Sequence, residues 1–438
     1  MHRPQPDVVQ AWLVARDVAV SIAGTRAILK TYNGSFPGPV LRVREGDRVQ
    51  LALTNQLAEP TNLHLHGLRV PASVDNPFLS VAPKKSVIYE FTVPPGSAGT
   101  HWYHPHLHER VARQLFAGLA GPIVVTGAID ERPELRVAED RLLVLKDLSL
   151  AGDRPAPHTA ADWVLGKEGD LVLVNGVVGP VLPATRSLLR LRLLNASNAR
   201  YYRLALDDHP LHLIATDSGF LDRPVEMAEV LLAPGERAEV LIQLERAGTF
   251  DLVDLGYARS HMVMGMGRIG PGGSERAPRS TRLLTIAVPT AFSSAVLPAT
   301  LGRVSVISPD QASGTRRLVL GEGMMGAWFS INGRPFDPRR VDLRGRLGTL
   351  EIWEVENRGR MDHPFHLHTY PFQVLSRGRT PEPFAAWKDV VNVQPGEIVR
   401  LAVPLRDFTG RTVYHCHIAE HEDRGMMGVF EVSAGAGA

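Results

Sequence analysis

The sequence predicts an all-β fold made of three similar β-sandwich domains, and three observations support this prediction. Gly and Pro together make 73 of the 438 residues, a proportion that suits a turn-rich β protein. Short runs such as VLRVREGDRVQLAL (40–53) and TLEIWEVEN (349–357) alternate apolar and polar residues with a period of two, which indicates strands. Closely spaced strands with turn residues between them are typical of sandwiches, and parts of the sequence repeat along the chain.

The repeats show which domains are copies of one another. GTHWYHPH (99–106) resembles GRTVYHCH (410–417), and NLHLHG (62–67) resembles PFHLHT (364–369), so the first and last domains share one design. A middle copy is marked by APGERAEVLIQL, which resembles QPGEIVRLAVPL near the C-terminal end. We therefore expect three domains, at residues 1–127, 140–287 and 316–438.

Composition also predicts the connections between domains. Residues 127–140 form a short charged link after the first domain. Residues 271–315 are rich in Gly, Pro and Ser, and we expect them to cross from the second domain to the third.

Composition excludes several classes of protein. The net charge is +2, which gives no electrostatic case for nucleic-acid binding. No apolar run reaches the ~18 residues that a membrane-spanning helix needs. The single cysteine, Cys416, excludes an internal disulfide framework and a CxxC zinc site, but it leaves room for a metal site that uses one thiolate.

The seventeen histidines are strongly clustered. Twelve of them lie in four short segments, two near each end of the chain: His64 and His66; His101, His104, His106 and His108; His363, His366 and His368; His415, His417 and His421. Every segment contains His-x-His, and on a strand residues i and i+2 point to the same face. Four such pairs predict a metal centre rather than four polar strand faces.

The segment around the cysteine indicates which metal. Cys416, His421 and Met426, joined by His363, form a His₂Cys set with a candidate axial thioether, which is the ligand set of a blue-copper site. The first domain has Thr61, Pro105 and Leu119 at the positions of His363, Cys416 and Met426. Only the third domain can therefore hold this site. The alignment also selects Met426 as the axial ligand over Met427, which we expect in the core.

The middle domain carries DHPLHLI (208–214), which resembles DHPFHLH in the third domain and offers His209 and His212. A further copper site and a remnant of duplication are both open readings. Phe250, Asp251 and Leu252 stand near the positions of the His-Cys-His triplet, so we favour the remnant and expect a structural domain without a complete copper site.

The chain resembles the three-domain multicopper oxidases, and within them the bacterial laccases, notably those of thermophilic bacteria. The resemblance rests on NGSFPGPVLRVREGD, HLHGL, WYHPHLH, HPFHLH and HCHIAEHEDRGMMG, and it spans nearly the whole chain. It implies three cupredoxin-like Greek-key β-sandwich or barrel domains and four coppers per chain: one type 1, one type 2 and two type 3.

The resemblance also assigns ligands residue by residue. It implies type 1 copper at His363, Cys416 and His421 with axial Met426; type 2 copper at His64 and His366; one type 3 copper at His66, His104 and His417; and the other at His106, His368 and His415. The three-copper cluster would then lie between the first and third domains. Cys416 is bonded along the chain to His415 and His417, which gives electrons a short covalent route from the type 1 site.

The same resemblance predicts the reaction. It implies a laccase-type oxidase that takes electrons singly from phenols and aromatic amines, near His421, and reduces dioxygen to two waters. Two acidic residues, Asp75 and Glu422, match acidic positions of the family and are expected to relay protons. The family is commonly exported, so a periplasmic or secreted location is expected, and we expect a monomer.

Two alternatives concern the substrate and the class. HMVMGMG carries Met262, Met264 and Met266, and thioethers select Cu(I), so a cuprous oxidase that binds its substrate there is the second hypothesis. Adaptable core packing is the simpler explanation for these methionines. A non-catalytic copper-binding protein of cupredoxin type would predict gaps in the histidine set, and the sequence has none. Direct nitrite reduction by copper usually goes with two-domain chains that trimerise, so the three domains expected here argue against it.

Overall fold

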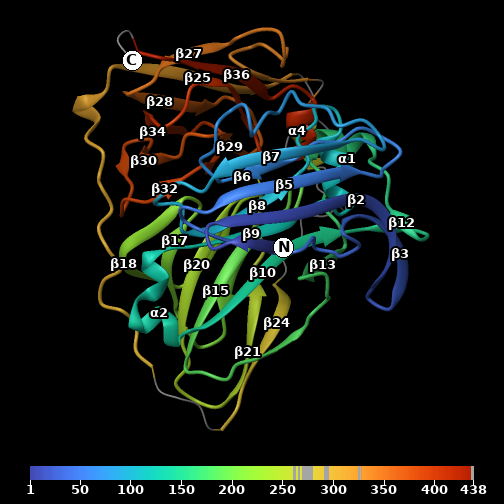
Figure 1. The fold of residues 1–438 in the computed structure, drawn as a ribbon, viewed down its shortest axis with the longest axis vertical. Helices are drawn as coiled ribbons and strands as arrows, with labels where there is room; N and C mark the ends of the chain where they lie inside the picture. Colours follow the sequence, from blue (N-terminus) through green and yellow to red (C-terminus); the bar gives the residue numbers. More distant parts are fainter. Residues whose placement is uncertain are drawn as a thin grey trace.

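The computed structural model describes residues 1–259, 280–290, 295–323, 326, 328–435 and, for the backbone alone, 263–264 and 267–268. Its strands form three sandwiches of two sheets each, which confirms the predicted fold class. Figure 1 shows the third domain at the top, the first beside and below it, and the second at the bottom. In the part of the chain that is described, no helix is long and apolar enough to cross a membrane.

The first domain pairs a five-stranded sheet with a four-stranded sheet. The larger sheet has the order β1 (His2–Gln5), β2 (Val8–Ile22), β5 (Arg48–Asn55), β7 (Ser86–Thr92), with β3 (Thr25–Tyr32) on β2. The smaller has the order β4 (Leu41–Arg44), β9 (Gly121–Thr126), β8 (Gly99–His104), β6 (His64–His66). Side chains alternate between buried and partly exposed along β5, as its period-two sequence predicts.

The second domain has a six-stranded and a five-stranded sheet. The first has the order β13 (Leu171–Val174), β10 (Glu139–Leu148), β15 (Leu188–Asn195), β20 (Arg237–Gln243), β17 (Leu211–Thr216), β18 (Gly219–Met227). The second has the order β14 (Val181–Pro183), β24 (Thr281–Val288), β21 (Gly248–Asp254), β16 (Tyr202–Leu206), β19 (Val230–Leu232). Two short hairpins are β11 (Leu150–Ala151) with β12 (Arg154–Pro155) and β22 (Val263–Met264) with β23 (Gly267–Arg268).

The prediction that residues 271–315 connect the second and third domains was wrong for the middle of this segment. Residues 281–288 form β24, which pairs with β21 and β14 inside the second domain, because TRLLTIAV is an apolar β-branched run that the flanking Gly and Pro residues obscured. The crossing itself is shorter. Residues 295–313 run along one side of the molecule from the second domain to the third (Figure 1).

The third domain repeats the design of the first. Its larger sheet has the order β26 (Phe329–Ile331), β25 (Gly314–Glu322), β28 (Thr349–Asn357), β34 (Ile398–Leu405), β30 (Phe372–Arg377), β31 (Thr380–Pro381), with β32 (Trp387–Lys388) on β30. The smaller has the order β27 (Leu343–Arg346), β36 (Met427–Ser433), β35 (Gly410–Cys416), β29 (His363–Leu367), β33 (Val390–Val393).

Short helices join the domains. They are α1 (Val111–Phe116), α2 (Pro133–Val137), α3 (Ala160–Leu165) and α4 (Ala419–Asp423), with 3₁₀ turns at Ala128–Glu131 and Pro309–Gln311. Asp423 accepts hydrogen bonds from the backbone N–H groups of Val111 (3.3 Å) and Ala112 (2.8 Å), so α4 of the third domain caps the start of α1 in the first. Trp102 and Leu194 pack in the same buried cluster as residues from both helices.

Candidate metal centres

The first candidate centre lies in the third domain and is built by one strand pair and the helix that follows it. In the antiparallel pair β29–β35, His363 begins β29 and Cys416 ends β35. Helix α4 then brings His421 back toward the cysteine. Cys416 Sγ lies 3.5 Å from Nδ1 of His363 and 3.7 Å from Nδ1 of His421, and the two Nδ1 atoms are 3.3 Å apart.

The fourth predicted member, Met426, is fully buried in the same core cluster as Cys416. Its carbonyl accepts a hydrogen bond of 3.0 Å from the Cys416 backbone, and its N–H donates to the carbonyl of His421 at 2.9 Å. This loop therefore holds Met426 beside the cysteine and His421. Met427 begins β36 and is buried there, as expected.

The second candidate centre gathers eight buried histidines between the first and third domains. Four come from each domain: His64, His66, His104 and His106; His366, His368, His415 and His417. In the pair β6–β8, His64 stands opposite His104, and in the pair β29–β35, His366 stands opposite His415. The two equivalent strand pairs thus present their His-x-His segments to one another.

Within this cluster the imidazole nitrogens form three close groups. His106, His368 and His415 place their Nε2 atoms 3.0–3.1 Å apart. Nδ1 of His66 lies 3.4 Å from Nε2 of His104 and 3.2 Å from Nε2 of His417. The last pair, His64 and His366, has its Nε2 atoms 3.4 Å apart.

Acceptors face the outward nitrogens of six of the eight rings, whereas among the described residues Nδ1 of His106 and Nδ1 of His417 have none. Nδ1 of His104 donates to the carbonyl of Pro105 at 3.0 Å, and Nδ1 of His415 donates to the carbonyl of Cys416 at 2.9 Å. Since each neutral ring has one proton, Nε2 of His415 is bare, and so is Nε2 of His368, whose Nδ1 donates to Asp75; these two Nε2 atoms face one another at 3.1 Å. Facing lone pairs at 3 Å repel unless a cation lies between them, so the donor set suits a bound metal.

Burial keeps the rings neutral, which is the form that binds metal. It lowers the pKa of His104 and His363 to about 3 each. Burial first, and then the charge of neighbouring histidines, lowers the pKa well below its ordinary value at His64, His66, His106, His366, His415, His417 and His421. Burial raises the pKa of the Cys416 thiol, so a cation would have to displace its proton.

Comparison with known proteins identifies the family. Sequence models described as multicopper oxidase match residues 15–129, 149–263 and 311–436. The chain is 33% identical over 411 residues to multicopper oxidase mco of Staphylococcus haemolyticus, covering 92% of this chain and 83% of that protein. It belongs to the multicopper oxidase family.

Solved structures agree with this assignment. A multicopper oxidase from Campylobacter jejuni, described as a metallo-oxidase, superposes with a TM-score of 0.88 at 33% identity, covering 99% of this chain and 93% of that one. A laccase-like multicopper oxidase, CueO, from Ochrobactrum sp. gives a TM-score of 0.87 at 30% identity, covering 98% and 100%. The family includes copper-dependent oxidoreductases with oxygen as acceptor, and the histidine clusters of this chain suit copper.

Asp75 lies directly behind two of the histidines. One oxygen, Oδ1, accepts from Nδ1 of His64 (2.7 Å) and from the backbone N–H of Leu65 (3.0 Å), and the other accepts from Nδ1 of His368 (3.0 Å). Burial alone would raise the pKa of Asp75, but these hydrogen bonds and the nearby imidazoles hold it below its ordinary value. The carboxylate therefore stays charged and fixes which nitrogen of each ring faces the cluster.

Glu422 contacts the opposite side of the cluster. Its two oxygens lie 3.4 Å from Nε2 of His106 and 3.3 Å from Nδ1 of His415. Burial, and then the negative charges of Asp423 and Glu420, raise the pKa of Glu422 well above its ordinary value. Burial therefore favours the protonated form of this carboxyl group.

Asp389 is a further buried carboxylate that sequence reasoning missed. It accepts from Nε2 of His66 (3.0 Å), its backbone carbonyl accepts from Nδ1 of His366 (2.7 Å), and Arg237 holds both of its oxygens at 2.6–2.7 Å. Burial would raise the pKa of Asp389, and the paired Arg237 lowers it far below its ordinary value. The available signal was a lone carboxylate placed directly before the apolar strand Val390–Val393.

The second domain packs against both centres, and the sequence did not reveal these contacts. Gly235 has φ = +85°, and a side chain there would meet the imidazole of His417 at 2.7 Å. On the other centre, Nε2 of His421 donates to the carbonyl of Val164 in α3 at 3.0 Å, and His421 is fully buried. Helix α3 therefore covers the imidazole that the resemblance places nearest the electron donor.

The remaining predicted residues lie elsewhere. His209 packs against Phe250 at 4.4 Å between ring centres, and its Nδ1 donates to the carbonyl of Asp207. His212 lies on β17 of the second domain. Met262 and Met266 lie outside the described residues, as does the side chain of Met264.

Proposed function

We propose that this multicopper oxidase couples the one-electron oxidation of reduced donors to the four-electron reduction of dioxygen to two waters. The observation that carries the proposal is the convergence of bare, neutral imidazole nitrogens from the first and third domains, beside a separate His₂Cys centre. Bound copper would supply redox centres that each carry one electron.

We assign the copper types from this arrangement. The group of His363, Cys416, His421 and Met426 would hold type 1 copper, and the pair His64–His366 would hold type 2 copper. The two triplets, His66–His104–His417 and His106–His368–His415, would hold the type 3 pair. The short distances within these groups support this assignment.

The protein's own groups then have distinct tasks. Cys416 is covalently linked through the backbone to His415 and His417, which shortens the route between the two centres. Asp75 orients two ligand rings through charge-assisted hydrogen bonds. Glu422 holds a proton against the cluster, where oxygen reduction consumes four of them.

A copper count and a visible spectrum test the proposal. We expect about four coppers per chain and an intense blue thiolate band after loading with copper. A chain that takes up no copper, or that takes it up without consuming dioxygen in the presence of donors, would contradict it.

For the donor we propose phenols and aromatic amines, as in laccases. Similarity to the laccase-like enzyme of Ochrobactrum sp. supports this class. One observation favours the second candidate, a cuprous oxidase. His421 is buried beneath Val164, so an organic donor cannot touch the imidazole in this conformation, and the relative from Campylobacter jejuni is described as a metallo-oxidase.

Substituting Met262, Met264 and Met266 together with leucine separates the two candidates. A cuprous oxidase that uses these thioethers should show a raised KM for Cu(I) and an unchanged KM for phenols. Equal effects on both donors would reject the role of the methionines. Leucine is a suitable replacement because it keeps the apolar volume and removes only the soft ligand.

We also propose that the protein works as a monomer in the periplasm or after secretion, where the family is commonly found. Fractionation of the native cells and size-exclusion chromatography check these two points. Activity confined to the cytoplasmic fraction, or a stable dimer, would contradict them.

A further inference from the structure

A large cavity lies where the three domains meet, away from the His₂Cys centre. Its volume is about 520 Å³, within the range of small-molecule sites. The first domain contributes Arg69, the second contributes Ser218 and Phe220, and the third contributes Trp387 and Arg406. Nothing in the proposed electron or proton transfer uses this cavity.

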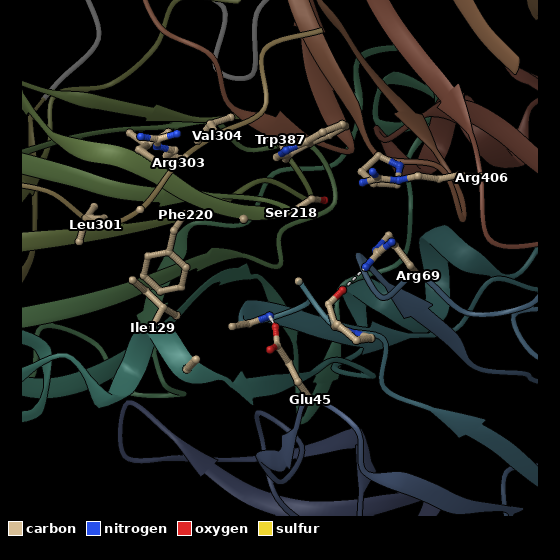
Figure 2. Close-up of a pocket in the computed structure, with 18 of the residues that line it drawn as sticks. Glu45, Arg69, Ile129, Ser218, Phe220, Leu301, Arg303, Val304, Trp387 and Arg406 are labelled. Carbon is tan, nitrogen blue, oxygen red and sulfur yellow. Dashed lines mark hydrogen bonds between the residues drawn. The ribbon is translucent and has the colours of Figure 1, made fainter. Parts of the chain in front are cut away.

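The cavity has an apolar side and a cationic side. Figure 2 shows Phe220, Ile129 and Leu301 on one side of the hollow with Arg303 above them, Arg69 and Arg406 on the other, and Trp387 on the rim between them. A ligand that fills it must therefore combine an apolar body with a negative group.

The charges on the cationic side are unequally neutralised. Arg69 is satisfied: it donates to Asp407 Oδ2 at 2.5 Å and to the carbonyl of Pro95, and its side chain is only 13% exposed. Arg406 is not. Its nearest carboxylate is the same Asp407 at 3.9 Å, and its side chain is 47% exposed. Burial, and then the positive charge of Arg69, lower the pKa of Arg406, as expected for a cation that lacks a full partner.

Trp387 fixes the position of this guanidinium. Arg406 Cζ lies 4.8 Å from the centre of the indole ring, a cation–π contact that holds the guanidinium at the rim. Glu45 also lines the cavity, and one of its oxygens accepts from the backbone N–H of Ala98 at 2.9 Å. The donors of Arg406 are thus fixed, exposed to the cavity and available to an anion.

A smaller cavity adjoins the large one and is lined by residues of the histidine cluster. This narrow second cavity of about 10 Å³, room for roughly one water, is lined by His64, His366 and His368 and shares Ser218 with the large one. The hydroxyl of Ser218 donates to Asp389 Oδ2 at 2.9 Å, and Asp389 contacts His66. An occupant of the large cavity would cover this narrow approach.

We propose that the cavity binds a small aromatic carboxylate, with its ring on the Phe220 wall and its carboxylate on Arg406. A planar ring suits the apolar wall that contains Phe220, and a carboxylate matches the two donors of a guanidinium fork. The binding site does not depend on the proposed function. Its consequence, restricted access of dioxygen to the cluster, rests on that function.

Calorimetry with cinnamate tests the site, since cinnamate has no phenolic group to oxidise. We expect one cinnamate per chain in copper-loaded and copper-free protein alike, with binding about tenfold weaker in Arg406→Gln and weakened less in Arg406→Lys, which keeps the charge but not the fork. Arg113→Gln is the matched control, because Arg113 also lies over a tryptophan, Trp163 at 5.5 Å, and lines a different cavity of about 430 Å³.

The possible outcomes test the charge of the ligand, its ring, the site itself and its effect on dioxygen separately. Equal binding of cinnamyl alcohol would refute the role of charge, and binding of inorganic phosphate without cinnamate would refute the role of the ring. Loss of binding in Arg113→Gln, or no saturable binding, would overturn the site itself. If cinnamate binds but leaves the KM for dioxygen unchanged in the active enzyme, the covering of the approach is refuted and the site stands.

Discussion

Replacing Asp75 with asparagine should leave copper in place and slow the reduction of dioxygen. The carboxylate accepts three hydrogen bonds, from Nδ1 of His64, Nδ1 of His368 and the N–H of Leu65. An asparagine side chain keeps one accepting oxygen and turns an NH₂ group toward a ring nitrogen that carries a proton. One charge-assisted hydrogen bond is therefore lost, together with control over which nitrogen of that ring faces the cluster.

The size of the effect follows from that single bond. A hydrogen bond to a charged group contributes about 1.5–3 kcal/mol, which corresponds to roughly a 10- to 100-fold change in rate. We expect reoxidation of the reduced enzyme by dioxygen, followed by stopped-flow absorbance, to slow by this factor while the copper count stays the same. The direct contacts of the other ligand rings are not altered by the substitution.

Asp254→Asn is the matched control for this experiment. Asp254 is a buried carboxylate of the second domain that accepts from the backbone N–H groups of Arg203 and Gly256 at 3.0 and 2.9 Å, away from both centres. A copper-replete Asp75→Asn enzyme with unaltered reoxidation and turnover would refute the reasoning. A loss of equal size in the control would show that buried aspartates matter here only for folding.

Three further predictions follow from other groups. Cys416→Ser should lose the blue band and one copper of four, and a persisting band would show that the thiolate is not its source. Glu422→Gln should slow oxygen consumption about 100-fold with unchanged copper, whereas the exposed neighbour in Glu109→Gln should have no effect; comparable rates in the two variants would exclude Glu422 as a proton source. Burial lowers the pKa of Lys146 to about 8, and among the described residues its Nζ has no hydrogen-bond partner. A lysine whose pKa falls on folding destabilises the protein below that pKa, so Lys146→Met should raise the free energy of unfolding by about 3 kcal/mol at pH 7. This gain should shrink between pH 8 and 10.5, and a gain independent of pH would refute the buried charge as its cause.

Much of the fold and of the candidate centres could be predicted because they depend on local sequence. Period-two alternation marked strands such as β5, and the repeat of His-x-His placed four ligand pairs on two equivalent strand pairs. Since each pair is fixed by neighbouring residues, its geometry does not require knowledge of the rest of the chain.

The features that sequence reasoning missed depend on contacts between distant segments. Asp389 reaches His66 only because the first and third domains meet, and Arg237 joins them from the second domain. Val164 covers His421 from a helix more than two hundred residues away in the chain. No local pattern encodes these pairings, because each partner alone looks like an ordinary buried or loop residue.

The division of the histidine cluster between the first and third domains also constrains how the protein is made. His64 lies on β6 and His417 directly follows β35, with most of the chain between them, so neither half of the cluster has its partners until the last strands have folded. Metal can then enter only a finished, buried site, and bound copper would close a loop of some 350 residues. Bound metal would therefore mark a completely synthesised chain, because a truncated product could fold its early domains and would still lack half of the metal ligands.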